Sequence, residues 1–240
     1  MRKGESRVFL KHGLRVLAAM LVMILWVGPA SEVGAARVLI IDSGIGRHDQ
    51  LPALDPSRWY DAANGHKKPY DSLGHGTFVA GRLLEVYPEV DLYVANVRTS
   101  RGVYDIDAVI RAIEWGVSQE VDIINLSLAW DRDYLPAKRA IEEAADKNII
   151  LLAAHTGDGL YPYPAGHSAV ISVGTTSGDI MADGGCPGRR ILGLDTYNRY
   201  QYGYGSSYAV PVIAGEMARL RDQHPEHEAR ELLQILRGDE

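Results

Sequence analysis

Three residues with complementary chemistry stand where predicted elements begin or end. Asp42 ends the β-branched run "VLIID", and His75 lies in "DSLGHGTFVAG", where a helical pattern begins. Ser207 heads an apolar helical pattern in "GSSYAVPVIAG". A serine hydroxyl is a weak nucleophile until a neighbouring base takes its proton, and a carboxylate can orient that base. The three residue types therefore fit nucleophilic catalysis, provided that the fold brings them together.

Each of these residues also has a simpler interpretation when it is taken alone. Serine is a preferred N-cap, aspartate is a common turn former, and a histidine in a glycine-rich turn can serve local backbone groups. Pro211 is tolerated only in the first turn of a helix, so we predict that the last apolar helix begins near Ser207. The hydroxyl would then lie beside unpaired N–H groups, which suits a cap and a nucleophile alike.

The elements that must position these residues alternate along the chain. Apolar β-type runs occur at 37–44, 91–97, 121–128, 148–154 and 169–176, and helical patterns lie between them at 76–87, 106–118 and 136–147. Continuous apolar strands separated by helices predict a three-layer α/β fold, with a mostly parallel central sheet covered on both faces. We expect loops over residues 177–205, which are rich in glycine and tyrosine, and a last amphipathic helix over 224–236.

Four segments, in their order and spacing, resemble the signature segments of the subtilisin-like serine proteases. They are "LIIDSGI", "HGTFVAG", "IEWGVSQEVDIINLSL" and "GSSYAVPVIAG", and the resemblance covers roughly residues 37–230. It implies a serine endopeptidase that cleaves polypeptides through an acyl-enzyme. Ser207 would be the nucleophile, His75 the general base and then acid, and Asp42 the group that orients the imidazole.

The resemblance also implies substrate contacts and an oxyanion site. An extended peptide would lie between Ser100, Arg101, Gly102 and the segment Ser127, Leu128, Ala129, where Ala129 replaces the family's glycine. The wall of the specificity pocket would include residues 153–157 and 163–166. The family presents an asparagine as second oxyanion donor, whereas this chain reads "LLAAHTGDG". Thr156 would take its place, with Asp158 as the alternative.

The first 36 residues are interpreted as a secretory signal peptide. Five basic residues precede a 13-residue apolar run, which is shorter than a bilayer span, and small residues follow it. An uncleaved membrane anchor is the alternative. We therefore expect a secreted or periplasmic protein whose residues 37–240 form one compact peptidase domain without an evident propeptide. The sequence leaves the oligomeric state open.

Composition limits the partners and cofactors. The net charge is −6, and removal of the basic N-terminus makes it more negative, so nucleic acid is not expected as a partner. The family's calcium-binding interruption of the helix after His75 is missing, so we expect no metal and no other cofactor. Cys186 is the single cysteine, which excludes an internal disulfide and is interpreted as a structural thiol.

Two functions from other classes compete with the peptidase interpretation. A catalytically weak or inactive peptide-binding module would keep the fold but lack a competent oxyanion site. A dinucleotide-binding protein would use Gly44 and Gly46, but Asp49 stands where the third glycine of that fingerprint is needed.

Overall fold

The computed structural model describes residues 34–157 and 162–239. The chain divides at Gly34, and the unit from Ala35 onward contains every element described below. The predicted signal peptide and the alternative oxyanion residue Asp158 lie outside the described residues. Within the described part of the chain, no helix is long and apolar enough to cross a bilayer.

A seven-stranded parallel sheet forms the centre of the unit, in the order β2-β3-β1-β4-β5-β6-β7. The strands are β1 (Arg37–Asp42), β2 (Trp59–Asp61), β3 (Asp91–Asn96), β4 (Ile123–Leu126), β5 (Ile150–Ala154), β6 (Val170–Gly174) and β7 (Ile180–Met181). Because β1 pairs in parallel with both β3 and β4, Asp42 ends in register with Asn96, at the carboxyl edge of the sheet. The predicted α/β class is confirmed.

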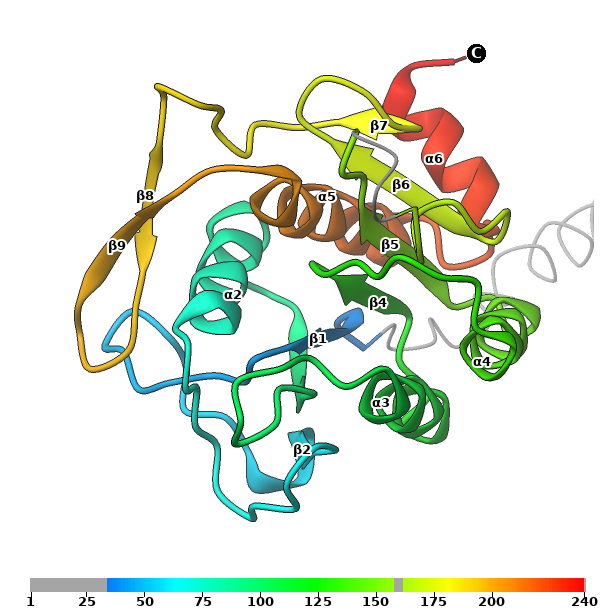
Figure 1. Ribbon diagram of the computed structural model, residues 1–240. Helices are drawn as coiled ribbons and strands as arrows, with labels where there is room; N and C mark the ends of the chain where they lie inside the picture. The colour runs from blue at the N-terminus through cyan, green and yellow to red at the C-terminus, as the bar shows by residue number, and fades with distance from the viewer. Residues whose placement is uncertain (1–33, 158–161, 240) are drawn as a thin grey trace, which may run out of the picture. The chain divides into compact units, whose positions relative to one another are not determined.

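Helices cover both faces of the sheet (Figure 1). One face packs against α2 (His75–Val86), α5 (Val210–Gln223) and α6 (Ala229–Arg237), and the other against α3 (Ile106–Ser118) and α4 (Leu135–Asp146). Successive residues of β1 alternate between the two cores, with Val38 and Ile40 on the α2 side and Leu39 and Ile41 on the α3 side. Burial on both faces explains why these strands have continuous apolar sequences.

The expectation of loops over residues 177–205 is wrong for three parts of this segment, which form strands, while the residues between them are loops. This segment contains β7 and the antiparallel hairpin of β8 (Ile191–Leu194) and β9 (Tyr200–Gly203), which packs beside α2. A Cβ atom at Gly193 would lie 1.8 Å from the Phe78 ring, so this glycine permits close contact between strand and helix rather than a loop. Tertiary packing, which local composition does not report, stabilises the hairpin.

Two helix starts also differ from the prediction. A 3-10 turn, η2 (Ser206–Tyr208), precedes α5, so the α-helix begins at Val210 rather than at Ser207. Pro211 does lie in its first turn, as its missing N–H requires. The last helix begins at Ala229 rather than at residue 224, because the Glu231 carboxylate accepts from the Glu228 backbone N–H and fixes the helix entry there.

Candidate active site

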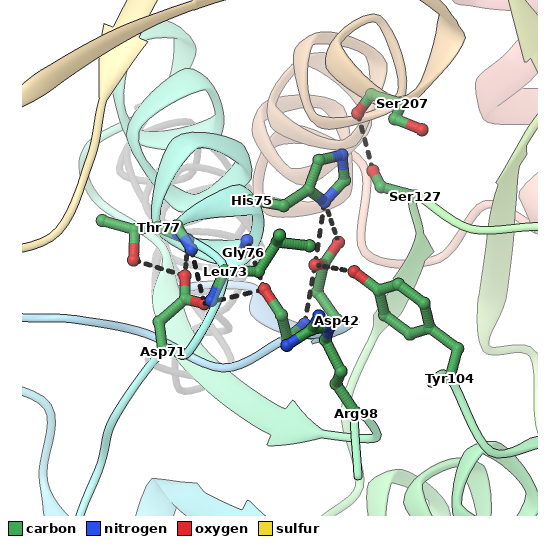
Figure 2. A network of polar contacts seen from close by, with 12 residues as sticks. Asp42, Asp71, Leu73, His75, Gly76, Thr77, Arg98, Tyr104, Ser127 and Ser207 are labelled. Atoms are coloured by element: carbon green, nitrogen blue, oxygen red, sulfur yellow. Dashed lines mark hydrogen bonds and ion pairs between the residues drawn. The ribbon is translucent and has the colours of Figure 1, made fainter. Parts of the chain in front are cut away.

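Asp42 lies fully buried at the carboxyl end of β1, and its carboxylate contacts His75. The Nδ1 atom of His75 is 2.8 Å from Oδ1 and 2.9 Å from Oδ2. Oδ1 also accepts from the Ser43 backbone N–H at 2.7 Å and from the Tyr104 hydroxyl at 3.2 Å. The carboxylate is therefore held by donors and presents both oxygens to the imidazole (Figure 2).

The loop before α2 fixes the position of His75, the first residue of that helix. Gly74 has a φ of 83°, which favours glycine, and the chain turns there into the helix. Asp71 Oδ1 accepts from the backbone N–H groups of Leu73 and Gly74, and Oδ2 accepts from the N–H and hydroxyl of Thr77. A single carboxylate thus joins the turn to the first helical residues.

Glycine at position 76 lets α2 approach the end of β1 closely. A Cβ atom at Gly76 would lie 2.2 Å from the Gly44 carbonyl oxygen and 3.2 Å from the Asp42 Cβ. No side chain fits in that space, so the "HG" pair places His75 against Asp42 through backbone contact.

The charges around His75 favour its protonated form. Burial of the imidazole opposes protonation, but the charge and hydrogen bond of Asp42, with a further contribution from Asp71, outweigh burial and raise the pKa of His75 above its usual value. The Tyr208 ring lies 5.2 Å from the imidazole, centroid to centroid. The residue after Ser207 therefore packs against the histidine.

Ser207 lies in the η2 turn, beyond the outer nitrogen of the His75 imidazole and away from Asp42 (Figure 2). Its backbone carbonyl accepts from the Ser127 hydroxyl at 2.8 Å, and Ser127 in turn accepts from the Asn125 amide. Gly205 is the N-cap residue of η2 and Ala209 is the N-cap residue of α5, and neither helix has a side-chain hydrogen bond at its N-cap. The N-cap interpretation of Ser207 is therefore wrong.

The neighbouring Ser206 has a different environment. Its hydroxyl donates to the His155 carbonyl oxygen at 2.6 Å, which ties the η2 turn to the end of β5. The two adjacent serines are thus distinguishable, because Ser206 is engaged with the backbone of another strand.

A pocket of about 300 Å³ opens beside Ser207. Its lining includes Leu128, Ala129 and Thr156 from the predicted set, and also Ala154, Gly185, Cys186, Pro187 and Tyr204. The predicted wall at 163–166 is not part of this lining, and Tyr163 instead pairs with Trp130. Cys186 is a free, half-buried thiol at this pocket rather than a core residue.

The predicted peptide-binding segment at residues 100–102 forms a tight turn, and these residues do not line the pocket beside Ser207. The Thr99 N–H donates to the Val103 carbonyl oxygen at 2.9 Å, and residues 100–102 lie in the turn between them. Ser127, by contrast, is buried and turned toward the Ser207 carbonyl rather than into the pocket. Of the 127–129 segment, Leu128 and Ala129 line the pocket.

Sequence reasoning missed two residues that contact the site. Asp71 carried a local signal, since it stands four residues before His75 in the same glycine-rich turn. Tyr104 carried none, because its contact with Asp42 spans 62 residues of sequence and depends on the fold.

A family model described as the subtilase family, peptidase S8, matches residues 35–238. The chain belongs to the subtilase family. This subtilase is 28% identical over 212 residues to the minor extracellular protease Epr of Bacillus subtilis (strain 168), over 79% of this chain and 32% of that protein. It is 28% identical to the thermostable alkaline protease of Halalkalibacterium halodurans, over 83% of this chain and 60% of that protein.

Subtilisin E of Bacillus subtilis (strain 168) is 29% identical over 219 residues, which are 79% of this subtilase and 56% of subtilisin E. The aligned part is thus less than two thirds of each of these three relatives. Two crystal structures have the same fold, each with a TM-score of 0.72 over 86% of this chain. They are a lanthipeptide protease, 22% identical with 81% covered, and a cold-adapted subtilisin-like serine proteinase, 21% identical with 82% covered.

Proposed function

We propose that this subtilase is a serine endopeptidase that uses Asp42, His75 and Ser207. The observation that carries the proposal is the contact of both Asp42 oxygens with His75 Nδ1, with Ser207 on the far side of the ring. The polypeptide substrate class, the roles of the three residues and secretion are parts of this proposal. The extracellular relative Epr supports the last of these.

In this proposal the proton moves from Ser207 to His75, which the Asp42 contact supports. With the Nδ1 proton donated to Asp42, the outer nitrogen Nε2 carries a lone pair and takes the proton of the Ser207 hydroxyl as that oxygen attacks the peptide carbonyl. The imidazolium formed is stabilised by Asp42, and it returns its proton to the leaving amine. Water then attacks the acyl-enzyme, with His75 again acting as base.

The oxyanion would be held beside the pocket described above. The Ser207 backbone N–H is one donor in this proposal, and the Thr156 hydroxyl is the other because Thr156 lines the same pocket as Ser207. An extended substrate would pass between the 100–102 turn and residues 128–129, with one side chain in the pocket. Backbone pairing of this kind is sequence-tolerant, so we expect broad cleavage specificity.

A fluorophosphonate probe tests the nucleophile, because it reacts covalently only with an activated serine. We expect the full chain to be labelled and Ser207→Ala to lose labelling. Ser206→Ala is the matched control, since it removes the adjacent hydroxyl, which is bonded to the His155 carbonyl, and it should still label. If only Ser206→Ala lost labelling, the nucleophile would be Ser206, and the proposed role of Ser207 would be wrong. Absence of labelling in the folded wild type would instead support a peptide-binding module.

A further inference from the structure

The turn between α5 and α6 carries three side chains that the proposed function does not use. His224, Glu226 and His227 each offer one ligand atom, and these atoms all lie within 4.8 Å of one another. The two imidazole rings are 5.2 Å apart, centroid to centroid, with an interplanar angle of 63°. Two ring nitrogens and a carboxylate oxygen thus converge on one point of the surface.

The backbone of this turn is fixed rather than extended into solvent. The His224 N–H donates to the Leu220 carbonyl oxygen and ends α5, and the His227 N–H donates to the His224 carbonyl oxygen at 3.2 Å. The buried Arg221 side chain donates to the His227 carbonyl oxygen at 2.6 Å. The ligand atoms therefore project from a preorganised turn, which reduces the entropic cost of binding.

Two of these ligand atoms already face each other. His227 Nδ1 is enclosed and lies 2.9 Å from a Glu226 carboxylate oxygen. A ring nitrogen and a carboxylate oxygen at this separation can both coordinate one cation placed between them and the second imidazole.

We propose that His224, Glu226 and His227 bind a divalent transition-metal ion of the Zn²⁺ type. Imidazole nitrogen and carboxylate oxygen are ligands that Zn²⁺ takes together, whereas Ca²⁺ and Mg²⁺ select oxygen ligands. The turn also stands at the C-terminal end of α5, where the helix dipole is negative and favours a cation. The missing calcium loop of the family predicts no metal after His75, and this turn is a different place in the fold.

Such an ion would join the end of α5 to the entry of α6. Both helices pack on the same face of the sheet, and Leu232 and Leu233 of α6 belong to the core that α5 also lines. Binding would therefore stabilise the folded chain without contact to Ser207, which lies before the other end of α5. The inference does not depend on the proposed peptidase activity.

Metal binding by the full chain tests the inference, with readouts other than activity. Titration calorimetry with Zn²⁺ should give one ion per chain, and the Co²⁺-loaded protein should show visible absorption bands typical of tetrahedral nitrogen and oxygen coordination. Zn²⁺ should raise the melting temperature, whereas Ca²⁺ should not. His224→Asn and His227→Asn should each lower the Zn²⁺ affinity by at least about tenfold.

His167→Asn is the matched control. His167 Nε2 lies 3.7 Å from a Glu142 carboxylate oxygen, so this pair has one histidine and one carboxylate but no second histidine. The control should bind Zn²⁺ like the wild type, and all variants should melt together with the wild type in the presence of EDTA. An unchanged affinity in the His224→Asn, His227→Asn double variant, or no binding by the wild type, would overturn the inference.

Discussion

Tyr104 donates a hydrogen bond to the carboxylate that contacts His75. Its hydroxyl lies 3.2 Å from Asp42 Oδ1 (Figure 2), the same oxygen that accepts from the Ser43 backbone N–H. Burial and the negative charge of Asp42 raise the pKa of Tyr104, so the phenol keeps its proton and remains a donor. Tyr104 is thus a positioning residue in the proposed mechanism, since it acts on His75 through Asp42.

Tyr104→Phe should shift the pH profile of kcat/KM toward higher pH on the acid side. Without the phenolic donor, the Asp42 carboxylate attracts the imidazolium more strongly, the pKa of His75 rises, and more alkaline conditions are needed to obtain the free base. The shift should be up to about one pH unit, given the strength of a hydrogen bond to a charged group. The measurement is hydrolysis of a peptide ester across the pH range.

Tyr134→Phe is the control for this change, because it removes a comparable tyrosine-to-aspartate bond, 3.0 Å to Asp107, on the exposed surface. It should leave the profile unchanged. A Tyr104→Phe profile identical to that of the wild type would show that the contact has no influence on His75.

The two candidates for the second oxyanion residue, Thr156 and Asp158, predict that different variants raise turnover. If the Thr156 hydroxyl takes the place of the family's asparagine on a shorter stem, the native rate is low and Thr156→Asn should raise it. Loss of one oxyanion donor costs about 10²–10³ in kcat, which sets the largest gain to expect. If Asp158 is the counterpart, Asp158→Asn should raise the rate instead. Turnover of a peptide ester by both variants distinguishes them, and no gain in either would mean that other groups hold the oxyanion.

At the scale of elements, the junction of β1 and α2 depends on one acidic side chain. Asp71 accepts from Leu73, Gly74 and Thr77, and its Oδ1 also accepts from the Ser43 hydroxyl at 2.8 Å. Ser43 follows Asp42 directly, so the same carboxylate links the strand end to the helix start (Figure 2). This connection acts together with the close backbone contact at Gly76 to hold His75 beside Asp42.

Asp71→Asn should lower both stability and activity and shift the acid side of the pH profile to lower pH. An amide has one acceptor oxygen where the carboxylate has two. Either Thr77 or the backbone N–H groups of Leu73 and Gly74 therefore lose their acceptor, which should lower the free energy of unfolding by about 1–3 kcal/mol. The lost negative charge also lowers the pKa of His75, a direction opposite to that expected for Tyr104→Phe. Thermal melting and the pH profile are the measurements.

Asp55→Asn provides the comparison for Asp71→Asn. Asp55 accepts from the Ser57 N–H at 2.8 Å before a short 3-10 helix on the surface, away from the site. Its replacement should leave the pH profile unaltered. A similar profile shift in both variants would argue for a general charge effect rather than a local one.

Some elements could be predicted from sequence because their signals are local. The α3 helix spans the predicted residues 106–118, with apolar residues on one face and the Asp105 side chain accepting from the Asp107 N–H at its start. The hairpin of β8 and β9 was missed because it depends on the contact between Gly193 and Phe78, which are far apart in sequence. The same distinction separates Asp42, which ends β1, and His75, which begins α2, from Tyr104, which contacts Asp42 from outside both elements.

At the scale of the whole molecule, α5 connects the parts of the described unit. Its buried residues include Val210, Ile213, Ala214 and Met217, and they belong to the core shared with β1, α2 and α6. The predicted apolar helix after Ser207 is therefore present, and it begins at Val210, three residues later than predicted. The apolar residues of its first turns indicated burial, whereas the 3-10 turn before it depends on Ser206 and Ser127 contacts that no local pattern encodes.

The strand order also determines when the site can be completed during synthesis. The strand β1 leaves the ribosome before both of its neighbours, β3 and β4, so the edge that carries Asp42 is assembled only after residue 126 has emerged. Ser207 follows Ser127, whose hydroxyl holds its carbonyl, by 80 residues. At about 5–20 residues per second, the proposed nucleophile is synthesised roughly 4–16 s after Ser127, and later than Asp42 and His75 as well. On the proposed chemistry, a growing chain cannot cleave its own unfolded segments during that interval.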